Sequence, residues 1–312
     1  MGQNAPSLVA LVRQCGLYLA LCLALFAGQA QAQSVGRAPV RSFDSIIESG
    51  VLKVALYDDF APYSFRQDGQ PRGVDYEVAE ALAKGLGLRL ELIWAPPGEN
   101  LDADLRDYIW RGHYLRPEVL ADVMLRVPYD REFAYKSNEF GELVNELVVM
   151  FGAYQRERWQ VAYDQRRLEA VPSIAVFQRH PIGVEVDSVP SFYLSSVFDG
   201  MLSAKTHHFA TPQAAFAGMR NGEVDAVMAM RGEIDWQLQQ AADDNLALAE
   251  NAYPDMGKQV WDIGMAVHES NRQLAYALEE KLEEMILAGE LKTLYSRYGL
   301  RYELPGLYQD ID

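Results

Sequence analysis

Residues 51–94 read VLKVALYDDFAPYSFRQDGQPRGVDYEVAEALAKGLGLRLELIW, and their hydrophobic period changes twice. Val51 to Leu56 is a short apolar run, as in a buried strand. From Val74 to Leu86 the apolar side chains recur at helical spacing and share one face, which predicts a helix. Leu88 to Trp94 alternate as a second strand. A strand, a helix and a strand at this spacing predict a βαβ unit in a mostly parallel sheet.

The same alternation continues through the rest of the chain. We predict strands at 121–125, 173–177, 224–230 and 260–267, helices at 101–110, 192–203 and 212–221, and two C-terminal helices on either side of Gly289. The chain leaves the first block near Val148 and returns near Asp262. Two crossings of this kind predict two lobes with a hinge and a cleft between them.

The composition is that of a globular protein, with 49% hydrophobic residues and a formal net charge of −16. Such a charge repels phosphate backbones, so nucleic acid is not an expected partner. The five histidines do not show the spacing of a metal site, and the sequence has no phosphate-binding or dinucleotide motif. We therefore predict neither a metal nor a cofactor.

Residues 1–32 are predicted to be a signal peptide. Arg13 precedes the apolar run GLYLALCLALFA at 16–27, and Ala30-Gln31-Ala32 offers the small residues that a signal peptidase accepts. The run is shorter than the ~20 residues of a transmembrane helix, although an uncleaved anchor remains an alternative. Both cysteines would leave with this peptide, and residues 33–41 would remain as a leader. The expected location of the soluble chain is the periplasm.

Several short motifs occur in an order that resembles a known family. Gly50 to Ala55 is followed by Pro62-Tyr63-Ser64-Phe65, by Gly73-Val74-Asp75 and by Gly222 to Val227. This order resembles the family-3 (polar amino acid type) periplasmic solute-binding proteins of ABC transporters. The resemblance implies an α/β, two-lobed periplasmic binding protein type II fold, with two mostly parallel sheets flanked by helices and a two-strand hinge. Lobe 1 would then hold residues 42–148 with 265–312, and lobe 2 residues 149–264.

The resemblance also implies a function. The protein would not be an enzyme but a periplasmic solute-binding protein, which captures a small polar or anionic solute in the interlobe cleft and presents it to the membrane subunits of an ABC permease. Arg131 matches the position at which family members grip the ligand carboxylate. The candidate ligand-binding residues are Asp58, Phe60, Tyr63, Phe65, Arg126, Arg131, Ser188, Ser191, Met230 and Arg231. As alternatives, the aromatic residues pack into their lobe and the serines only cap a helix.

Two positions depart from the family pattern. Arg126 stands where family members have a small hydroxyl residue, and Met230 stands where they have a carboxylate that pairs with the ligand ammonium. An ammonium buried against methionine would lose its hydration without gaining a counter-charge. A standard α-amino acid is therefore not the expected solute, and Arg126, Arg131 and Arg231 would face an anionic one. Alternatively, they form internal ion pairs with Asp130 and Glu233.

Two further functions stay open. Asp122-Val123-Met124 before Val127-Pro128, together with Trp261 to Val267, resembles binding-protein homologues associated with PQQ-dependent alcohol (methanol) dehydrogenases. That resemblance implies an accessory role, with a quinoprotein dehydrogenase or its cytochrome as partner. A periplasmic dehydratase-like enzyme on the same fold is the second alternative, because clustered arginines suit a prephenate-like diacid. Its acid or base would come from the carboxylates of Asp58, Glu185 and Asp187.

Overall fold

The computed structural model describes residues 36–309 as an α/β protein. The helices are α2 (Phe43–Ser49), α3 (Val74–Gly85), α4 (Leu101–Leu105), α5 (Arg131–Ala134), α6 (Val189–Ser196), α7 (Pro212–Asn221), α8 (Arg231–Ala241), α9 (Arg272–Leu287) and α10 (Glu290–Arg297). The strands are β1 (Val51–Tyr57), β2 (Phe65–Gln67), β3 (Gln70–Arg72), β4 (Arg89–Ala95), β5 (Val123–Pro128), β6 (Val148–Asp164), β7 (Ile182–Glu185), β8 (Thr206–Phe209), β9 (Ala226–Met230), β10 (Leu246–Ala249) and β11 (Val260–His268).

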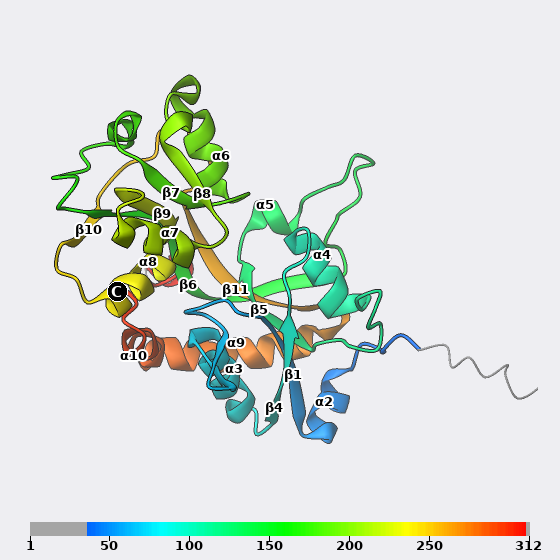
Figure 1. Ribbon diagram of the computed structural model, residues 1–312. Coiled ribbons are helices and arrows are strands. Elements are labelled where there is room, and N and C mark those ends of the chain that lie inside the picture. The colour runs from blue at the N-terminus through cyan, green and yellow to red at the C-terminus, as the bar shows by residue number, and fades with distance from the viewer. Residues whose placement is uncertain (1–35, 310–312) are drawn as a thin grey trace, which may run out of the picture.

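The large sheet consists of two parallel halves joined by antiparallel strands. Its strand order is β4-β1-β5-β11-β6-β9-β7-β8, with β10 beside β6. Strand β1 runs parallel to β4 and β5, and β7 runs parallel to β8 and β9. The 17-residue strand β6 pairs with β11 in the first half and with β9 and β10 in the second, so it joins the two halves (Figure 1). The lobe boundaries drawn from the sequence stay a prediction.

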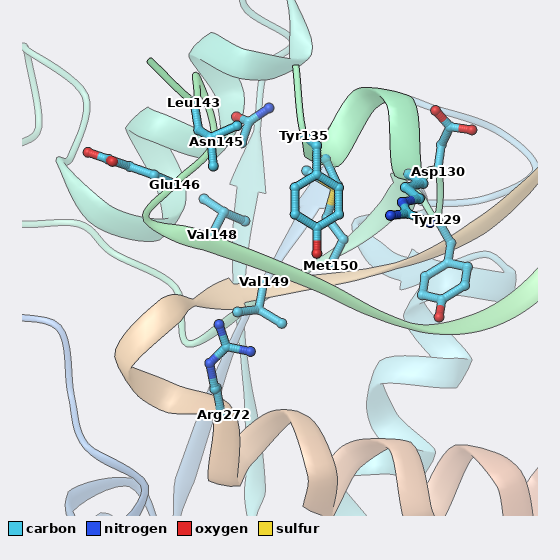
Figure 2. A pocket seen from close by; sticks show the side chains of 12 residues that line it. Tyr129, Asp130, Tyr135, Leu143, Asn145, Glu146, Val148, Val149, Met150 and Arg272 are labelled. Carbon is cyan, nitrogen blue, oxygen red and sulfur yellow. The ribbon is translucent and has the colours of Figure 1, made fainter. Parts of the chain in front are cut away.

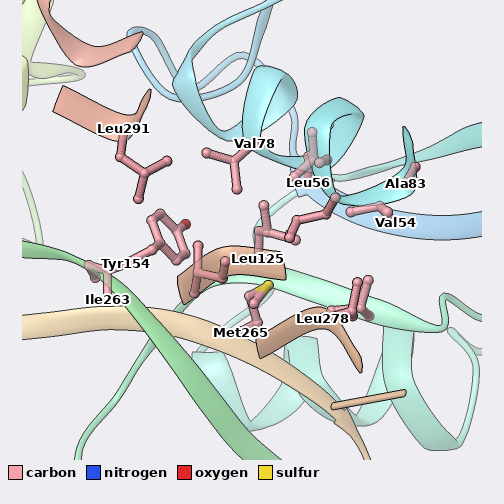
Figure 3. Close-up of a cluster of buried hydrophobic side chains, with 14 of the residues drawn as sticks. Val54, Leu56, Val78, Ala83, Leu125, Tyr154, Ile263, Met265, Leu278 and Leu291 are labelled. Atoms are coloured by element: carbon pink, nitrogen blue, oxygen red, sulfur yellow. The ribbon is translucent and has the colours of Figure 1, made fainter. Parts of the chain in front are cut away.

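The core of the first half lies between the sheet and helices α3, α9 and α10. Val54 and Leu56 of β1, Val78 of α3 and Leu278 of α9 are fully buried and converge on one another (Figure 3). The apolar period that predicts α3 from the sequence is therefore the face that packs on the sheet. The second half has its own cores around β9, so each half folds around separate apolar clusters.

The start of α3 carries a carboxylate into the interior. Gly73 precedes the helix with a φ of 117°, and a Cβ there would lie 2.2 Å from the carbonyl oxygen of Tyr63. Only glycine fits this close approach of two backbone segments. The backbone N–H of Asp75 then donates to the same carbonyl (2.9 Å), and the Asp75 side chain is buried.

Most of the predicted elements are confirmed, including α3, α7, α9, β1, β4, β9 and β11. The strand predicted at 173–177 is wrong, because Ile174–Gln178 is a 3₁₀ helix that buries Ile174 and Phe177. A short apolar run does not distinguish these two structures. The predicted helix at 101–110 continues from α4 as a π-helix, Arg106–Trp110, and the helix predicted at 192–203 begins and ends earlier, as α6. The sequence reasoning does not predict α2, β10, the full length of β6, or α8.

The predicted signal peptide, at residues 1–32, lies outside the described residues. Within 36–309, no helix combines the length and the apolar character that crossing a bilayer requires.

Candidate functional site

Arg126, near the end of β5, is the centre of a buried polar network. Its guanidinium donates to both carboxylate oxygens of Asp75, from Nε at 2.5 Å and from Nη2 at 2.9 Å. Nη2 also donates to Oε1 of Gln155 at 2.8 Å. Its backbone has a φ of 60°, which is unusual for a residue other than glycine, and its N–H donates to the Tyr154 hydroxyl at 3.1 Å. Only 7% of Arg126 is exposed, so the ion pair with Asp75 lies in the interior.

Tyr63 lies against this guanidinium and joins the two halves of the molecule. The Arg126 guanidinium carbon is 3.4 Å from the centre of the Tyr63 ring, an arrangement that allows a cation–π attraction. The buried Tyr63 hydroxyl donates to Oε2 of Glu157, on β6, at 2.7 Å. At Gly232, in helix α8 of the second half, a Cβ would lie 2.3 Å from the Tyr63 hydroxyl. The two halves therefore meet at Tyr63 and Gly232 without room for a side chain between them.

Two carboxylates complete the network. Glu157 accepts from Tyr63 and also from Nε2 of Gln155 at 2.9 Å. Glu233, in the first turn of α8, accepts the backbone N–H of Met230 at 3.1 Å. Burial raises the pKa of Glu233 to about 8, and the nearby carboxylates of Glu185 and Glu157 push it in the same direction. Burial also raises the pKa of Glu185.

The buried group that joins the two halves is called the junction cluster below. Its members are Tyr63, Asp75, Arg126, Gln155, Glu157 and Glu233. One guanidinium here faces three carboxyl groups, and burial raises the pKa of one of them, Glu233. Among the described residues, Nη1 of Arg126 is buried without a hydrogen-bond partner. The cluster thus has more acidic groups than cations, and one of its donors is buried without a partner.

Three other candidate residues, Phe60, Phe65 and Met230, have apolar neighbours. The Phe60 ring centre is 5.0 Å from that of Tyr63, and Met230 packs against the same apolar core. Phe65 instead contacts Trp236 of α8, with ring centres 5.8 Å apart. Phe60 and Phe65 therefore pack against other aromatic residues, which is the alternative that the sequence left open.

The internal ion pairs considered from the sequence are present, but with other partners. Arg126 pairs with Asp75, as described, and Arg231 pairs with Glu303. The partners named from the sequence are wrong, because Asp130 pairs with Lys258 and Glu233 lies in the junction cluster. Asp130 and Glu233 lie close in sequence to Arg126 and Arg231. The observed partners, Asp75 and Glu303, lie 51 and 72 residues away along the chain.

Asp58 and the two serines have local partners. Asp58 forms an ion pair with Arg66 at 2.6 Å. The Ser188 hydroxyl accepts the backbone N–H of Ser191 at 3.3 Å, and Ser188 is the N-cap of α6. The capping role considered for Ser188 is confirmed, while a ligand contact for either serine stays a prediction.

Arg131 lies in a different place from the cluster. It begins α5, is exposed, and lines a cavity of about 470 Å³ together with Tyr129, Tyr135 and Arg272 (Figure 2). No member of the junction cluster lines this cavity. The sequence pattern therefore selects residues in two separate regions, the cluster around Arg126 and the cavity around Arg131.

The sequence reasoning missed Asp75, Gln155, Glu157 and Glu233 as site residues. Asp75 has a signal in the sequence, since it follows Gly73-Val74 at a helix start, but that position is equally typical of an acidic residue near a helix N-terminus. Glu157 lies in a polar stretch of β6 that shows no apolar period. Among residues 36–309, no group of three or more His, Cys, Asp or Glu side chains is arranged to hold a metal ion.

The chain is similar to a family of bacterial binding proteins and to several solved structures. The family model of bacterial extracellular solute-binding proteins, family 3, matches residues 52–301. Among solved structures, an ancestral cationic amino acid solute-binding protein (AncCDT-1) is similar, with a TM-score of 0.63 and 19% identity, over 82% of this chain and 98% of that one.

Two further solved structures come from natural amino acid binding proteins. AbpA of Streptococcus pneumoniae, solved with L-arginine bound, has a TM-score of 0.57 and 21% identity, over 82% of this chain and 97% of its own. ArtJ of Geobacillus stearothermophilus, an arginine-, lysine- and histidine-binding protein, has a TM-score of 0.55 and 20% identity, over 83% and 98%. At these identities the likeness shows the fold, and it confirms the two-lobed type II fold expected from the sequence.

A shorter match involves an enzyme. Cyclohexadienyl dehydratase of Pseudomonas aeruginosa is 31% identical over 115 residues, which cover 36% of this chain and 41% of the enzyme. The matched stretch thus spans less than half of the enzyme's length.

Proposed function

Because the chain belongs to family 3 of the bacterial extracellular solute-binding proteins, we propose that it captures a small polar solute at the junction cluster and presents it to the membrane subunits of an ABC permease. The observation that carries this proposal is the buried, incompletely satisfied cluster at the contact of the two halves. A solute would enter when the halves separate at Tyr63 and Gly232, and would be shielded from water when they close again.

The charges of the cluster favour a solute with an amino or guanidino group. Arg126 is already bound to Asp75, so the cation that would attract an anionic solute is neutralised. Glu157 and Glu233 offer carboxylates for a cationic group, which answers the objection raised by Met230. The solved neighbours that bind L-arginine or other cationic amino acids are consistent with this choice.

A thermal-shift panel tests the proposal. The amine-bearing compounds are L-arginine, L-lysine, agmatine and putrescine, and the anionic ones are succinate, citrate and benzoate. A bound solute raises the unfolding temperature in proportion to RT ln(1 + [L]/Kd). We expect stabilisation by at least one amine-bearing compound at millimolar concentration. Stabilisation by the anions alone, or by no member of the panel, contradicts the proposal.

The matched variants are Glu157→Gln and Glu290→Gln. Both replace a carboxylate by an amide, but Glu157 is buried in the cluster and Glu290 is exposed at the start of α10. Loss of a buried charge partner weakens binding by tenfold or more, roughly. We therefore expect weaker binding of the amine-bearing compound with Glu157→Gln and unchanged binding with Glu290→Gln. Equal affinities for the two variants would place the solute elsewhere.

A dehydratase-like enzyme is a second candidate, favoured by one observation. A carboxyl group whose pKa is raised to about 8 keeps its proton at neutral pH and can donate it to a leaving hydroxyl group. Glu233 meets this condition, and part of the chain is similar to a dehydratase. The test is incubation with prephenate, followed by mass spectrometry, for the wild type and Glu233→Gln. A prephenate pool that stays the same as in a protein-free control rejects this candidate.

Two further predictions concern the cellular context of the protein. Cleavage after Ala32 would release the chain into the periplasm, in keeping with the extracellular family to which it belongs. N-terminal sequencing of the exported protein tests this cleavage. The accessory role beside a quinoprotein dehydrogenase stays a prediction that the relatives described above do not support.

A further inference from the structure

Strand β6 has an edge that no strand covers in the half of the sheet that it shares with β11, although the C-terminal segment reaches this edge at Arg156, whose N–H donates to the carbonyl of Glu303 at 3.0 Å. Within the described chain, residues 148–158 of β6 pair with β11 on one side, whereas β9 and β10 join β6 only from Trp159 onward. The backbone N–H of Glu269 donates to the carbonyl of Leu147 at 2.9 Å. In an antiparallel ladder such bonded pairs recur every second residue. Residues 149 and 151 therefore bond to β11, and the N–H and C=O groups of Val148 and Met150 point outward.

Among the described residues, the outward backbone N–H and C=O groups of Met150 have no hydrogen-bond partner. The outward N–H of Val148 donates to the Asn145 carbonyl at 3.0 Å, within the turn that enters the strand. The N–H of Gly152 donates to Oε1 of Glu279 on α9 at 3.2 Å. Between them, Met150 has no hydrogen bond beyond the sheet among the described residues, so its N–H and C=O are both available. A residue that paired with Met150 could exchange two backbone hydrogen bonds with it.

Val148, Val149 and Met150 of this edge line the cavity of about 470 Å³ that Arg131 also lines. Figure 2 shows that Val148 and Met150 point to the side of Tyr135, whereas Val149 points to the opposite side, toward Arg272. Tyr135 is 65% exposed, so much of its aromatic surface is accessible beside the strand. The two sides of the edge therefore differ: one presents the Tyr135 ring, with the guanidinium carbon of Arg131 5.9 Å from the ring centre, and the other presents the guanidinium of Arg272.

The charges around the cavity favour an acidic occupant. Arg131 and Arg272 are exposed and form no ion pair among the described residues, although the whole sequence has a net charge of −16. The acidic lining residue Asp130 is paired with Lys258 and caps α5, and Glu146 is exposed. Two free guanidiniums against one free carboxylate leave this edge locally positive.

We propose that the edge of β6 at Met150 binds an extended segment of a partner protein in which apolar and acidic residues alternate. Successive side chains of an added strand point to opposite faces, so every second residue would lie against Tyr135 and the others would point toward Arg272. The backbone groups of Met150 supply affinity, and the two unlike sides supply the preferred sequence pattern. This site is separate from the junction cluster and does not depend on the solute.

The test uses synthetic peptides and fluorescence anisotropy. The first peptide, fluorescein-labelled Thr-Asp-Leu-Asp-Leu-Asp-Thr, alternates the two kinds of residue. The second, Thr-Asp-Asp-Leu-Leu-Asp-Thr, has the same composition and charge without the alternation. The third is the first peptide with N-methyl groups on both Leu residues, whose N–H groups face β6 when their side chains lie on the side of Tyr135, so the backbone donors to Met150 are removed. We expect the first peptide to bind at least about fivefold more tightly than the other two.

Variants of the protein test the same contacts by changing the residues that would bind the peptide. Met150→Pro removes the outward N–H and leaves the bonds to β11 in place, as proline does on strand edges. Arg272→Glu reverses the charge of the site, and Arg220→Glu makes the same change on the exposed end of α7. We expect Met150→Pro and Arg272→Glu to weaken binding of the alternating peptide by at least about fivefold, and Arg220→Glu to leave it within about twofold.

Several results would overturn the proposal. Equal binding of the alternating and the shuffled peptide shows mere charge attraction, and unchanged binding to Arg272→Glu places the peptide elsewhere. Concentration-dependent dimers that the Met150→Pro variant lacks would show that a second copy of this chain occupies the edge. If Met150→Pro loses its cooperative thermal unfolding, the N-methylated peptide decides the question of the backbone bond alone.

Discussion

Replacing Arg126 by methionine removes the only guanidinium of the junction cluster. The change deletes two hydrogen bonds to Asp75 and one to Gln155, and it leaves the Asp75 carboxylate, which is 1% exposed, without a cation. Breaking a buried ion pair by removing one partner typically costs ~3–5 kcal/mol. The backbone strain at φ 60° is the same for both side chains and cancels. We therefore expect the free energy of unfolding to fall by ~3–5 kcal/mol.

Urea unfolding followed by tryptophan fluorescence measures this loss. The control is Arg297→Met, which breaks an exposed ion pair with Glu77 and should cost less than ~1 kcal/mol. The double variant Arg126→Met with Asp75→Leu removes both charges and should cost clearly less than the two single variants together. A loss below ~1 kcal/mol for Arg126→Met, or strict additivity in the double variant, would refute the account of the buried pair.

Three other changes at the cluster have expected outcomes. Gly232→Ala places a Cβ 2.3 Å from the Tyr63 hydroxyl, so it should destabilise the closed form by ~1–3 kcal/mol, measured by urea unfolding, with Gly257→Ala as an unhindered control. Tyr63→Phe should cost ~1–3 kcal/mol in the same assay, because Glu157 loses its 2.7 Å donor. The raised pKa of Glu233 stabilises the protonated form in the folded state, so this stability is complete below the pKa of the unfolded chain and is lost as the pH rises to about 8. The difference in unfolding free energy between wild type and Glu233→Gln should thus shift against the wild type between pH 5 and 8, roughly, and a constant difference would contradict the raised pKa.

Periodicity was sufficient to predict the α/β class and most of the elements, whereas the type II fold was predicted from the resemblance to a family. The apolar residues of α3 and of β1 recur at their characteristic spacing, and the same side chains are buried in the first core. Hydrophobic periodicity does not predict strand β6. Its 17 residues cross both halves and face different neighbours along their length, so no single period applies.

The site was only partly accessible from the sequence. Tyr63 and Arg126 were found through family motifs, and both lie in the junction cluster. Asp75, Glu157 and Glu233 were not, because their place in the cluster depends on neighbours that are distant in the sequence. Arg126 and Asp75, for example, are separated by 51 residues and meet because α3 packs beside β5.

Calorimetric titration of the most stabilising amine-bearing compound tests the central proposal most directly. It is performed at pH 7 in two buffers that differ in their heat of ionisation, with the wild type, Glu157→Gln and Glu290→Gln. The account predicts one solute per chain, release of a proton as Glu233 ionises beside the bound cation, and loss of affinity with Glu157→Gln alone. Binding that releases no proton and that Glu157→Gln leaves unchanged would contradict a solute site at the contact of the two halves.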